Sequence, residues 1–457
     1  MRLPPTKTSL VILTLLVLFA VPDFIPAFKE YRVFDWHSAS VVLDFHARQS
    51  PSNPVEEEQQ RLKPDTEALR TEAHPLVDKG FALDPFYAAL MRTERQEAGA
   101  ITQILHYGDS PTTADLITAD VRSLFQRQFG DAGHGFALIA KPWAWYGHRG
   151  IEVRGSGWKM DAANQIELRD GFFGLGGVSF RGSDGASARI VVKDGTHQGV
   201  EVSFLRQPDG GTFVLYAEGQ PLGSIDTHSE MNEPGFASFA IPEGSNKFEI
   251  KDVHGRVRLF GIRFGKQTPG VVYNSLGLNG ASVTALGRQM NEAHWTAELQ
   301  HAKPDLVIIN YGTNESVYAA YVDSSYEREL RLAIGRLKRA LPDSSIMIMS
   351  PMDRGKRDDS GEIVTVPALD RLINIQQRVA AETKCAFFNT FQAMGGPGTM
   401  GRWYQAEPRL VGADFIHPMP AGARIVGNLL YKSLMKGYNG YKLRHLQQRS
   451  AKLEEKN

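Results

Sequence analysis

The spacing of apolar residues divides the chain into regions of two kinds. From about residue 101 to 134, and again after about residue 271, short apolar runs alternate with segments whose apolar residues recur every three or four positions. This alternation predicts parallel strands joined by helices. Between about residues 135 and 270 the apolar period is two, and turns such as Asp209-Gly210-Gly211 separate the runs. That pattern predicts an all-β unit of antiparallel strands.

The helix-and-strand regions have clear candidate elements. Ile101–Tyr107 is predicted to be a buried strand and Thr112–Phe129 a helix, in which Thr112 and Asp115 would form a capping box. A short amphipathic helix is expected near Leu83–Met91. The later predicted strands are Val271–Tyr273, Leu306–Asn310, Ile346–Ser350 and Ala386–Asn389, and the later helices are Tyr326–Ala340, Ala368–Thr383 and Ala421–Met435.

The region of period two is expected to form a sandwich or jelly roll. Its predicted strands are Ala188–Lys193, Gly199–Arg206, Thr212–Glu218, Ala237–Ile241, Asn246–Asp252 and Arg256–Phe264. The simplest architecture is one α/β domain with a parallel sheet, interrupted by this β unit after its first strand and helix.

The N-terminus has the pattern of a targeting segment. Arg2 and Lys7 precede an apolar run, Leu10–Val21, as in the charged and apolar parts of a secretory signal. Because no clear cleavage site follows, either a cleaved signal peptide or a retained single-pass anchor over Leu10–Phe28 is expected, and a buried N-terminal helix is the alternative. Both leading interpretations place the rest of the chain outside the cytoplasm, in the periplasm or on the outer face of the inner membrane.

Composition and motif spacing together predict the division of the chain. The expected parts are a signal peptide or anchor (1–28), a Pro-, Glu- and Gln-containing linker (29–80), an α/β part (81–134), the β insertion (135–270), a second α/β part (271–440) and a polar tail expected to be a frayed helix (441–457).

Composition excludes several functions. The 457 residues include 51 Lys and Arg and 51 Asp and Glu, so the net charge is zero and nucleic-acid binding is not expected. The single cysteine, Cys385, cannot form an internal disulfide. No spacing of His and Cys suggests a metal site, and Gly395-Gly396-Pro397-Gly398 lacks the Lys of a phosphate loop. No cofactor or metal is therefore expected.

Four short motifs follow predicted strands, where open α/β sheets bind their ligands. They are Gly108-Asp109-Ser110, Gly277-Leu278-Asn279-Gly280-Ala281, Tyr311-Gly312-Thr313-Asn314-Glu315 and Asp414-Phe415-Ile416-His417-Pro418. Taken singly, each has a structural explanation, as a helix cap, a strand–helix turn or an exposed loop. Taken together, they supply a serine, a histidine that could accept its proton, an aspartate that could hold the histidine tautomer, and an asparagine amide for an oxyanion.

In this order the motifs resemble the blocks of the SGNH, or GDSL-type, hydrolases, over roughly residues 81–134 and 271–440. The resemblance implies a flavodoxin-like three-layer α/β/α fold. It implies that Ser110 is the nucleophile and that Asp414 and His417 complete the triad. It also implies an oxyanion hole formed by Ser110, Gly280 and Asn314.

Two residues depart from the family pattern. Pro111 follows the serine where an apolar residue or His is usual, and Glu315 stands where Asp is common. Pro111 lacks an N–H, but the expected oxyanion donor is the Ser110 N–H, so the hole is expected to survive. The family position of Glu315 is not catalytic, so that change is expected to affect mainly local hydrogen bonding.

The predicted β insertion indicates which class of substrate to expect. A β unit at this point looks like the carbohydrate-binding-module-like domain of peptidoglycan O-acetyl esterases, which implies an exported serine esterase acting on an O-acetylated glycan. A polysaccharide O-acetyltransferase and a tethered glycan-binding protein with a weak hydrolase site are the alternatives. Near the start of the insertion, Trp143, Trp145, Tyr146 and Trp158 could stack on sugar rings or pack the domains together.

Overall fold

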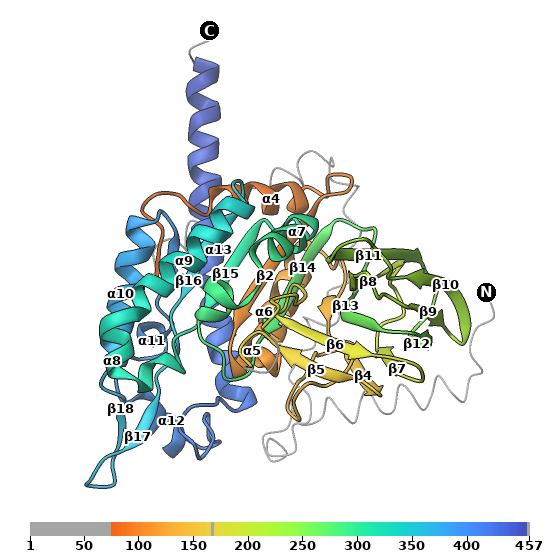
Figure 1. Ribbon diagram of the computed structural model, residues 1–457. Coiled ribbons are helices and arrows are strands. Elements are labelled where there is room, and N and C mark those ends of the chain that lie inside the picture. Colours follow the sequence, from red (N-terminus) through yellow and green to blue (C-terminus); the bar gives the residue numbers. More distant parts are fainter. Residues whose placement is uncertain (1–74, 166–168, 455–457) are drawn as a thin grey trace, which may run out of the picture. The chain divides into compact units, whose positions relative to one another are not determined.

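The computed structural model describes residues 75–165 and 169–454, with side chains to residue 448 (Figure 1). The predicted signal or anchor segment and most of the predicted linker lie outside these residues. Within the described part of the chain, no helix combines the length and the apolar composition needed to cross a membrane.

A mainly parallel sheet forms the centre of the α/β part. Over the described residues it has six strands in the order β1-β19-β16-β15-β2-β14. The bounds are β1 Leu76–Val77, β2 Ile101–Gly108, β14 Gly270–Gly277, β15 Leu306–Asn310, β16 Ser345–Met349 and β19 Ala386–Phe388. Only β1 runs antiparallel to its neighbour. Without β1, the strands numbered along the chain have the flavodoxin-like order 2-1-3-4-5.

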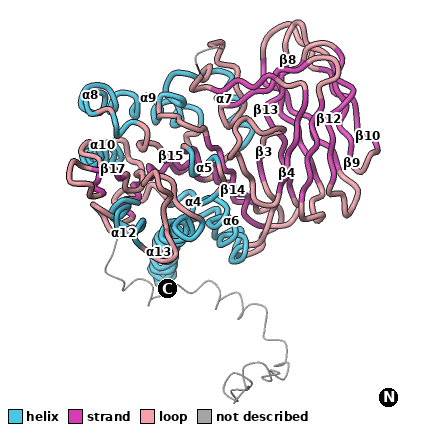
Figure 2. Tube along the Cα trace, turned by 90° about the horizontal axis from the view of Figure 1, so that it is seen from below, coloured by secondary structure: helices cyan, strands magenta, loops and turns pink. Residues whose placement is uncertain are grey.

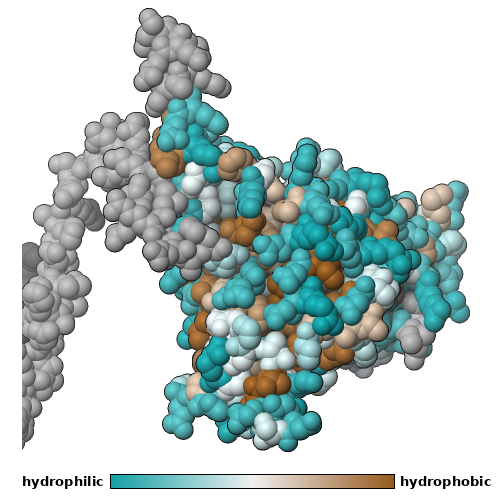
Figure 3. Space-filling view, turned by 90° about the vertical axis from the view of Figure 1, so that its left-hand side faces the viewer, coloured by the Kyte–Doolittle hydropathy of each residue, from teal (hydrophilic) through white to brown (hydrophobic). Residues whose placement is uncertain are grey.

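Helices cover both faces of this sheet because its strands are apolar on both sides. In β15, Leu306 and Ile308 belong to one core and Val307 and Ile309 to the other. The first core contains residues of α4 (Asp84–Glu94), α6 (Leu116–Phe129) and α13 (Pro420–Glu454), and the second contains residues of α7 (Glu292–Ala302), α9 (Glu327–Ala340) and α10 (Leu369–Glu382). Figure 2 shows the two helical layers on either side of the strands. The face seen in Figure 3 is mainly hydrophilic, with scattered apolar residues.

The β insertion consists of two antiparallel sheets that share one core, which contains Phe213, Phe248 and Phe264. One sheet has the order β10-β9-β12-β7-β4, with bounds Gln220–Asp226, Thr212–Ala217, Lys247–His254, Ser187–Val192 and Ile151–Ser156. The other has the order β11-β8-β13-β6-β5, with bounds Glu233–Ala240, Gly199–Arg206, Val257–Gly265, Val178–Gly182 and Lys159–Ala162, and β3 (Gly135–Ala137) also pairs with β13. The predicted α/β class with a parallel sheet and a β insertion is confirmed.

Short elements connect these layers and surround the strand ends. They are the helices α5 (Ser110–Thr113), α8 (Ala319–Tyr321), α11 (Thr390–Ala393) and α12 (Thr399–Gln405), the turns of helix Ala285–Gln289, Glu315–Val317 and Val322–Tyr326, and the hairpin strands β17 (Gly355–Arg357) and β18 (Ile363–Thr365).

The helix predicted over Thr112–Phe129 is wrong at its start. Two helices, α5 and α6, replace it, because Asp115 adopts the left-handed conformation with φ of 51°. The Asp115 carboxylate does not form a capping box with Thr112. Instead it binds the Arg122 guanidinium at 2.5 Å and accepts a 2.7 Å hydrogen bond from the Arg149 backbone N–H. The buried ion pair between Asp115 and Arg122 therefore stabilises the turn between α5 and α6.

Both ends of the α/β part extend beyond the predicted limits. The pair Leu76–Val77 lies in the sheet as β1, so the ordered fold begins before residue 81. The tail predicted from residue 441 is helical as far as Glu454, as the last part of the continuous helix α13. Lys442 Nζ lies 3.0 Å from Glu94 Oε1, and Arg444 lies 2.5 Å from Asp84, so the helix remains bound to α4 beyond residue 441.

Candidate active site

Two paired glycines bring the first two motifs together. Gly108 and Gly277 are register partners at the carboxyl ends of β2 and β14. A Cβ on Gly108 would lie 2.2 Å from Thr112 Oγ1, and one on Gly277 would lie 2.1 Å from the Thr113 backbone nitrogen. Only glycine at both positions lets α5 pack directly on the strand ends. Ser110, the first residue of α5, is therefore held at the switch point of the sheet.

A continuous chain of hydrogen bonds joins the three residues predicted as a triad. Ser110 Oγ lies 2.7 Å from His417 Nε2, and His417 Nδ1 lies 2.5 Å from Asp414 Oδ2. Ser110 and His417 are 307 positions apart in sequence. The structure thus brings together a hydroxyl, an imidazole and a carboxylate in the arrangement that activates a serine nucleophile.

A tight turn holds Asp414 against His417. Asp414 Oδ1 accepts hydrogen bonds from the Ile416 and His417 backbone N–H groups, at 3.0 and 3.1 Å. Burial alone would raise the pKa of Asp414, but these bonds and the one from the His417 ring outweigh it and lower the pKa. The carboxylate therefore stays ionised at neutral pH and can stabilise a protonated His417.

Three residues carry the candidate oxyanion donors. Gly280 has φ of 68°, and a Cβ there would meet nothing within 4 Å, so its surroundings are open. Among the described residues, the backbone N–H groups of Ser110 and Gly280 have no hydrogen-bond acceptor. One amide N–H of Asn314 donates to the Ala281 carbonyl at 2.8 Å, which leaves the other available. The catalytic roles of these residues remain predictions.

Two buried acids lie beneath the site. Asp109 is 3 % exposed, and burial raises its pKa to about 6, although a hydrogen bond from Thr313 and the charge of His417 oppose the shift. Burial also raises the pKa of Glu315 to about 7. Glu315 Oε1 accepts a 2.9 Å hydrogen bond from the Val283 N–H. Glu315, which departs from the family pattern, therefore binds the third motif to the segment directly after the second.

Sequence reasoning missed Arg354 and the role of Phe415. Arg354 Nη1 donates to the Thr313 carbonyl at 2.6 Å and supports the turn that carries Asn314. Phe415 is a non-glycine residue with φ of 59°, between Asp414 and His417. The only sequence signal for Arg354 was its place shortly after a predicted strand, and no sequence signal marked the conformation of Phe415.

The predicted aromatic cluster is not a single surface. Tyr146 is 8 % exposed, and its hydroxyl accepts a 2.8 Å hydrogen bond from Leu138 N–H. Trp143 and Trp158 are half-buried, whereas Trp145 is 55 % exposed. Trp145 Nε1 donates to Asn279 Oδ1 at 3.0 Å, beside Gly280. Trp145 therefore links the β insertion to the second motif.

No group of three or more His, Cys, Asp and Glu side chains among the described residues could hold a metal ion. His106 lies on β2, near the end of the strand that leads to Ser110. Its Nδ1 is 2.7 Å from the Tyr273 hydroxyl, and burial lowers its pKa to about 4. His106 is a packed residue of the core.

Comparison with known proteins agrees with this geometry. The model of the GDSL-like lipase/acylhydrolase family matches residues 243–425, which include Gly280, Asn314, Asp414 and His417. The chain carries a GDSL-like lipase/acylhydrolase domain. This domain is a carboxylic ester hydrolase by class, as predicted. Ser110 lies outside the matched residues, and the fold brings it to them.

A solved structure shares the fold over most of this chain. A peptidoglycan O-acetylesterase is similar with a TM-score of 0.68 and 22 % sequence identity, over 80 % of this chain and 99 % of that one. The GDSL-like domain and the β insertion are therefore found together in another protein. A family two carbohydrate esterase from Clostridium thermocellum, solved with cellohexaose, has a TM-score of 0.27 at 12 % identity, over 62 % of this chain and 100 % of that one. No curated protein matches the sequence.

Proposed function

We propose that the protein is an exported serine esterase that removes O-acetyl groups from a cell-wall glycan, peptidoglycan in the first place. The observation that carries the proposal is the hydrogen-bonded chain of Ser110, His417 and Asp414. The similar peptidoglycan O-acetylesterase supports the choice of glycan, and the N-terminal pattern of charged and apolar residues supports export.

The geometry supports a two-step acyl transfer. Ser110 Oγ attacks the acetyl carbonyl while His417 Nε2 takes the serine proton, and His417 returns that proton to the departing sugar hydroxyl. The N–H groups of Ser110 and Gly280 and the free amide N–H of Asn314 would stabilise the oxyanion. Water, deprotonated by His417, then releases acetate and regenerates Ser110.

Hydrolysis of short esters tests this proposal. We expect the protein to hydrolyse 4-nitrophenyl acetate faster than the butyrate and octanoate esters, and to release acetate from O-acetylated peptidoglycan. Ser110→Ala should abolish both activities without changing the circular dichroism spectrum, since it removes only the nucleophile. A folded wild-type protein with no turnover above this variant would contradict the esterase. If an added glycan acceptor then restored the release of 4-nitrophenol, with the acetyl group transferred to a glycan hydroxyl, the protein would instead be an O-acetyltransferase.

A further inference from the structure

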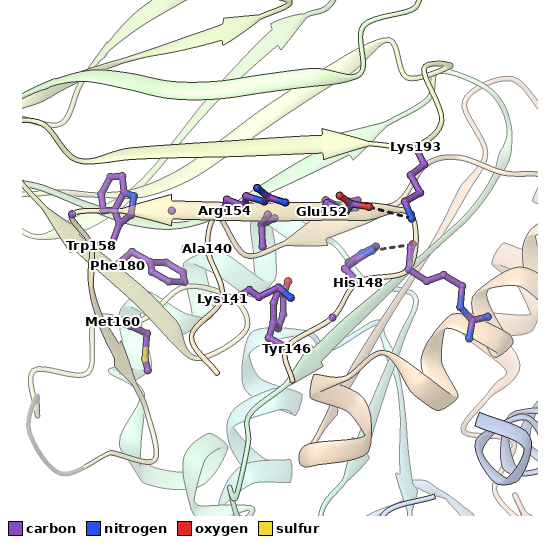
Figure 4. A pocket seen from close by; sticks show the side chains of 17 residues that line it. Ala140, Lys141, Tyr146, His148, Glu152, Arg154, Trp158, Met160, Phe180 and Lys193 are labelled. Atoms are coloured by element: carbon purple, nitrogen blue, oxygen red, sulfur yellow. Dashed lines mark hydrogen bonds and ion pairs between the residues drawn. The ribbon is translucent and has the colours of Figure 1, made fainter. Parts of the chain in front are cut away.

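The β insertion has an open groove of about 830 Å³ along one side (Figure 4). Strand β4 forms one wall, and it is the edge strand of its sheet. Met160, from the edge strand of the other sheet, and Phe180 from its neighbour lie opposite, with Trp158 at one end. The groove therefore lies where the sandwich leaves two sheet edges uncovered within the described residues.

Strand β4 presents unused backbone groups to this groove. The Gly150 carbonyl accepts a 2.8 Å hydrogen bond from Lys193 N–H, which fixes the pairing of even-numbered β4 residues with β7. The N–H and C=O groups of Val153 and Gly155 consequently point to the open side. Among the described residues they have no ladder partner there, whereas Ile151 N–H is already bonded to the His148 carbonyl. Such an edge is a template for an added strand.

The groove is also cationic. Its charged lining residues are Lys141, Arg149, Arg154 and Lys193 against one carboxylate, Glu152. Arg149 and Lys193 each form an ion pair with a carboxylate. Lys141 and Arg154 are exposed and have no ion pair among the described residues, so their charges are available to a ligand. Figure 4 shows both side chains beside the opening.

The segment that lines the groove is hydrogen-bonded to the helix that Ser110 begins. Gly147 N–H donates to the Thr113 carbonyl at 3.2 Å, in the helix that Ser110 begins. The neighbouring Trp145 is bonded to Asn279 beside Gly280. A chain held in the groove would therefore lie against the same segment, Trp145–Gly147, that contacts the site.

We propose that this groove binds an extended, carboxylate-bearing peptide, of the kind attached to the glycan of peptidoglycan. The inference rests on the proposed function, and it assigns the peptide part of that substrate to the insertion. The free N–H and C=O groups of Val153 and Gly155 offer donors and acceptors that the N–H and C=O groups of an extended peptide can pair with. The free cations at the rim match peptide carboxylates.

Binding to purified peptidoglycan tests the inference independently of turnover. The full chain, as the Ser110→Ala variant, is sedimented with peptidoglycan that carries its peptides and with the same material after an amidase has removed them. We expect tighter binding to the peptide-bearing material. Arg154→Glu should weaken that binding about three- to tenfold, and adding Lys141→Glu should weaken it further.

Lys432→Glu is the matched control. Lys432 is exposed on α13, does not line the groove, and undergoes the same change of charge. We expect it to bind like the parent, and all three substitutions to leave 4-nitrophenyl acetate hydrolysis unchanged in the Ser110 protein. Equal binding to peptide-free glycan, or equal losses in Arg154→Glu and Lys432→Glu, would overturn the inference. Failure to hydrolyse acetate esters would overturn the proposed function alone.

Discussion

At the scale of single residues, the proposed catalytic turn depends on a residue whose backbone has an unfavourable conformation. Phe415 has φ of 59°, which costs a non-glycine residue on the order of 1 kcal/mol. Its ring packs edge-on against Tyr404, with centroids 4.9 Å apart, and beneath the Arg357 guanidinium at 5.1 Å. Its carbonyl accepts a 2.9 Å hydrogen bond from Gly355 N–H. The β17–β18 hairpin and α12 thus hold the turn that presents Asp414 and His417.

Replacing this ring should disorder the turn. We expect Phe415→Ala to lower kcat about tenfold with a smaller change in KM, because the distance between His417 and Ser110 would no longer be fixed. Phe415→Gly removes the same ring but tolerates positive φ, so it should be more stable than the alanine variant by roughly 0.5–1 kcal/mol in urea unfolding. Wild-type kcat in both variants would show that the ring does not position the turn.

The free amide N–H of Asn314 gives a second prediction at this scale. Asn314→Ala should lower kcat for 4-nitrophenyl acetate by about 10²–10³ because one oxyanion donor is lost. Asn314 also bonds the Ala281 carbonyl, so the thermal midpoint of unfolding should be measured alongside. Undiminished turnover in a folded variant would remove Asn314 from the proposed hole.

The order of the motifs pointed to Ser110, Asp414 and His417, which hydrogen bonds join in the structure, because chemistry constrains the residue types of a triad. The oxyanion roles of Gly280 and Asn314 stay predictions. Arg354 and Phe415 were not predictable, because their effect comes from contacts with Thr313, Tyr404 and Arg357 that only the fold creates.

At the scale of elements, α7 joins the α/β part to the β insertion. The His301 ring stacks on Phe236 with centroids 3.6 Å apart, and its Nε2 lies 3.0 Å from Glu201. Glu298, on the same helix, is 2 % exposed, and its Oε1 has no hydrogen-bond partner among the described residues. Burial raises the pKa of Glu298 to about 8, partly opposed by Arg263 and increased by Glu201.

Stability should therefore depend on pH through Glu298. Its folded pKa lies above its ordinary value of 4.5, so the folded state keeps a proton that the unfolded chain loses. The contribution of Glu298 to the free energy of unfolding is fully present below about pH 4.5, and it is lost as the pH rises toward 8. We expect Glu298→Gln to raise the thermal midpoint of unfolding at pH 8 and to raise it much less at pH 5. Each kcal/mol gained in the free energy of unfolding should raise the midpoint by about 2–4 °C. An equal effect at both values would show that Glu298 is not protonated in the fold.

Elements were predictable where their periodicity was strong. α9 and α10 lie within one residue of the predicted Tyr326–Ala340 and Ala368–Thr383, because each has a continuous apolar face. Strands β4, β5 and β6 were not predicted. In β4 and β5 the inward positions are few and alternate with charged or glycine residues, so their strand conformation depends on neighbours in the sheets.

At the scale of the whole molecule, hydrogen bonds from the insertion hold the loop that carries Gly280. One is Trp145 Nε1 to Asn279 Oδ1, and another is Asn164 Nδ2 to the Asn279 carbonyl, at 2.8 Å. Both converge on the residue before Gly280, so the insertion helps to fix a proposed oxyanion donor.

Loss of the Trp145 bond should affect even a small substrate. We expect Trp145→Phe to lower kcat/KM for 4-nitrophenyl acetate about two- to tenfold, the effect of one hydrogen bond of roughly 0.5–1.5 kcal/mol. Phenylalanine keeps a flat ring, so a contribution from stacking on sugar would persist. A variant impaired only on peptidoglycan would assign Trp145 to substrate contact instead.

The sheet order also determines when the protein can assemble. Strand β2 pairs only with β14 and β15, and both follow the entire insertion in the chain. During synthesis Ser110 therefore emerges long before any neighbour of its strand, whereas the hairpins of the insertion can close as soon as they leave the ribosome. The insertion is thus in a position to fold first and to bring β2 and β14 together. Asp414 and His417 follow β19 in the chain, so Ser110 meets them only after the remaining strands have added to this first pair.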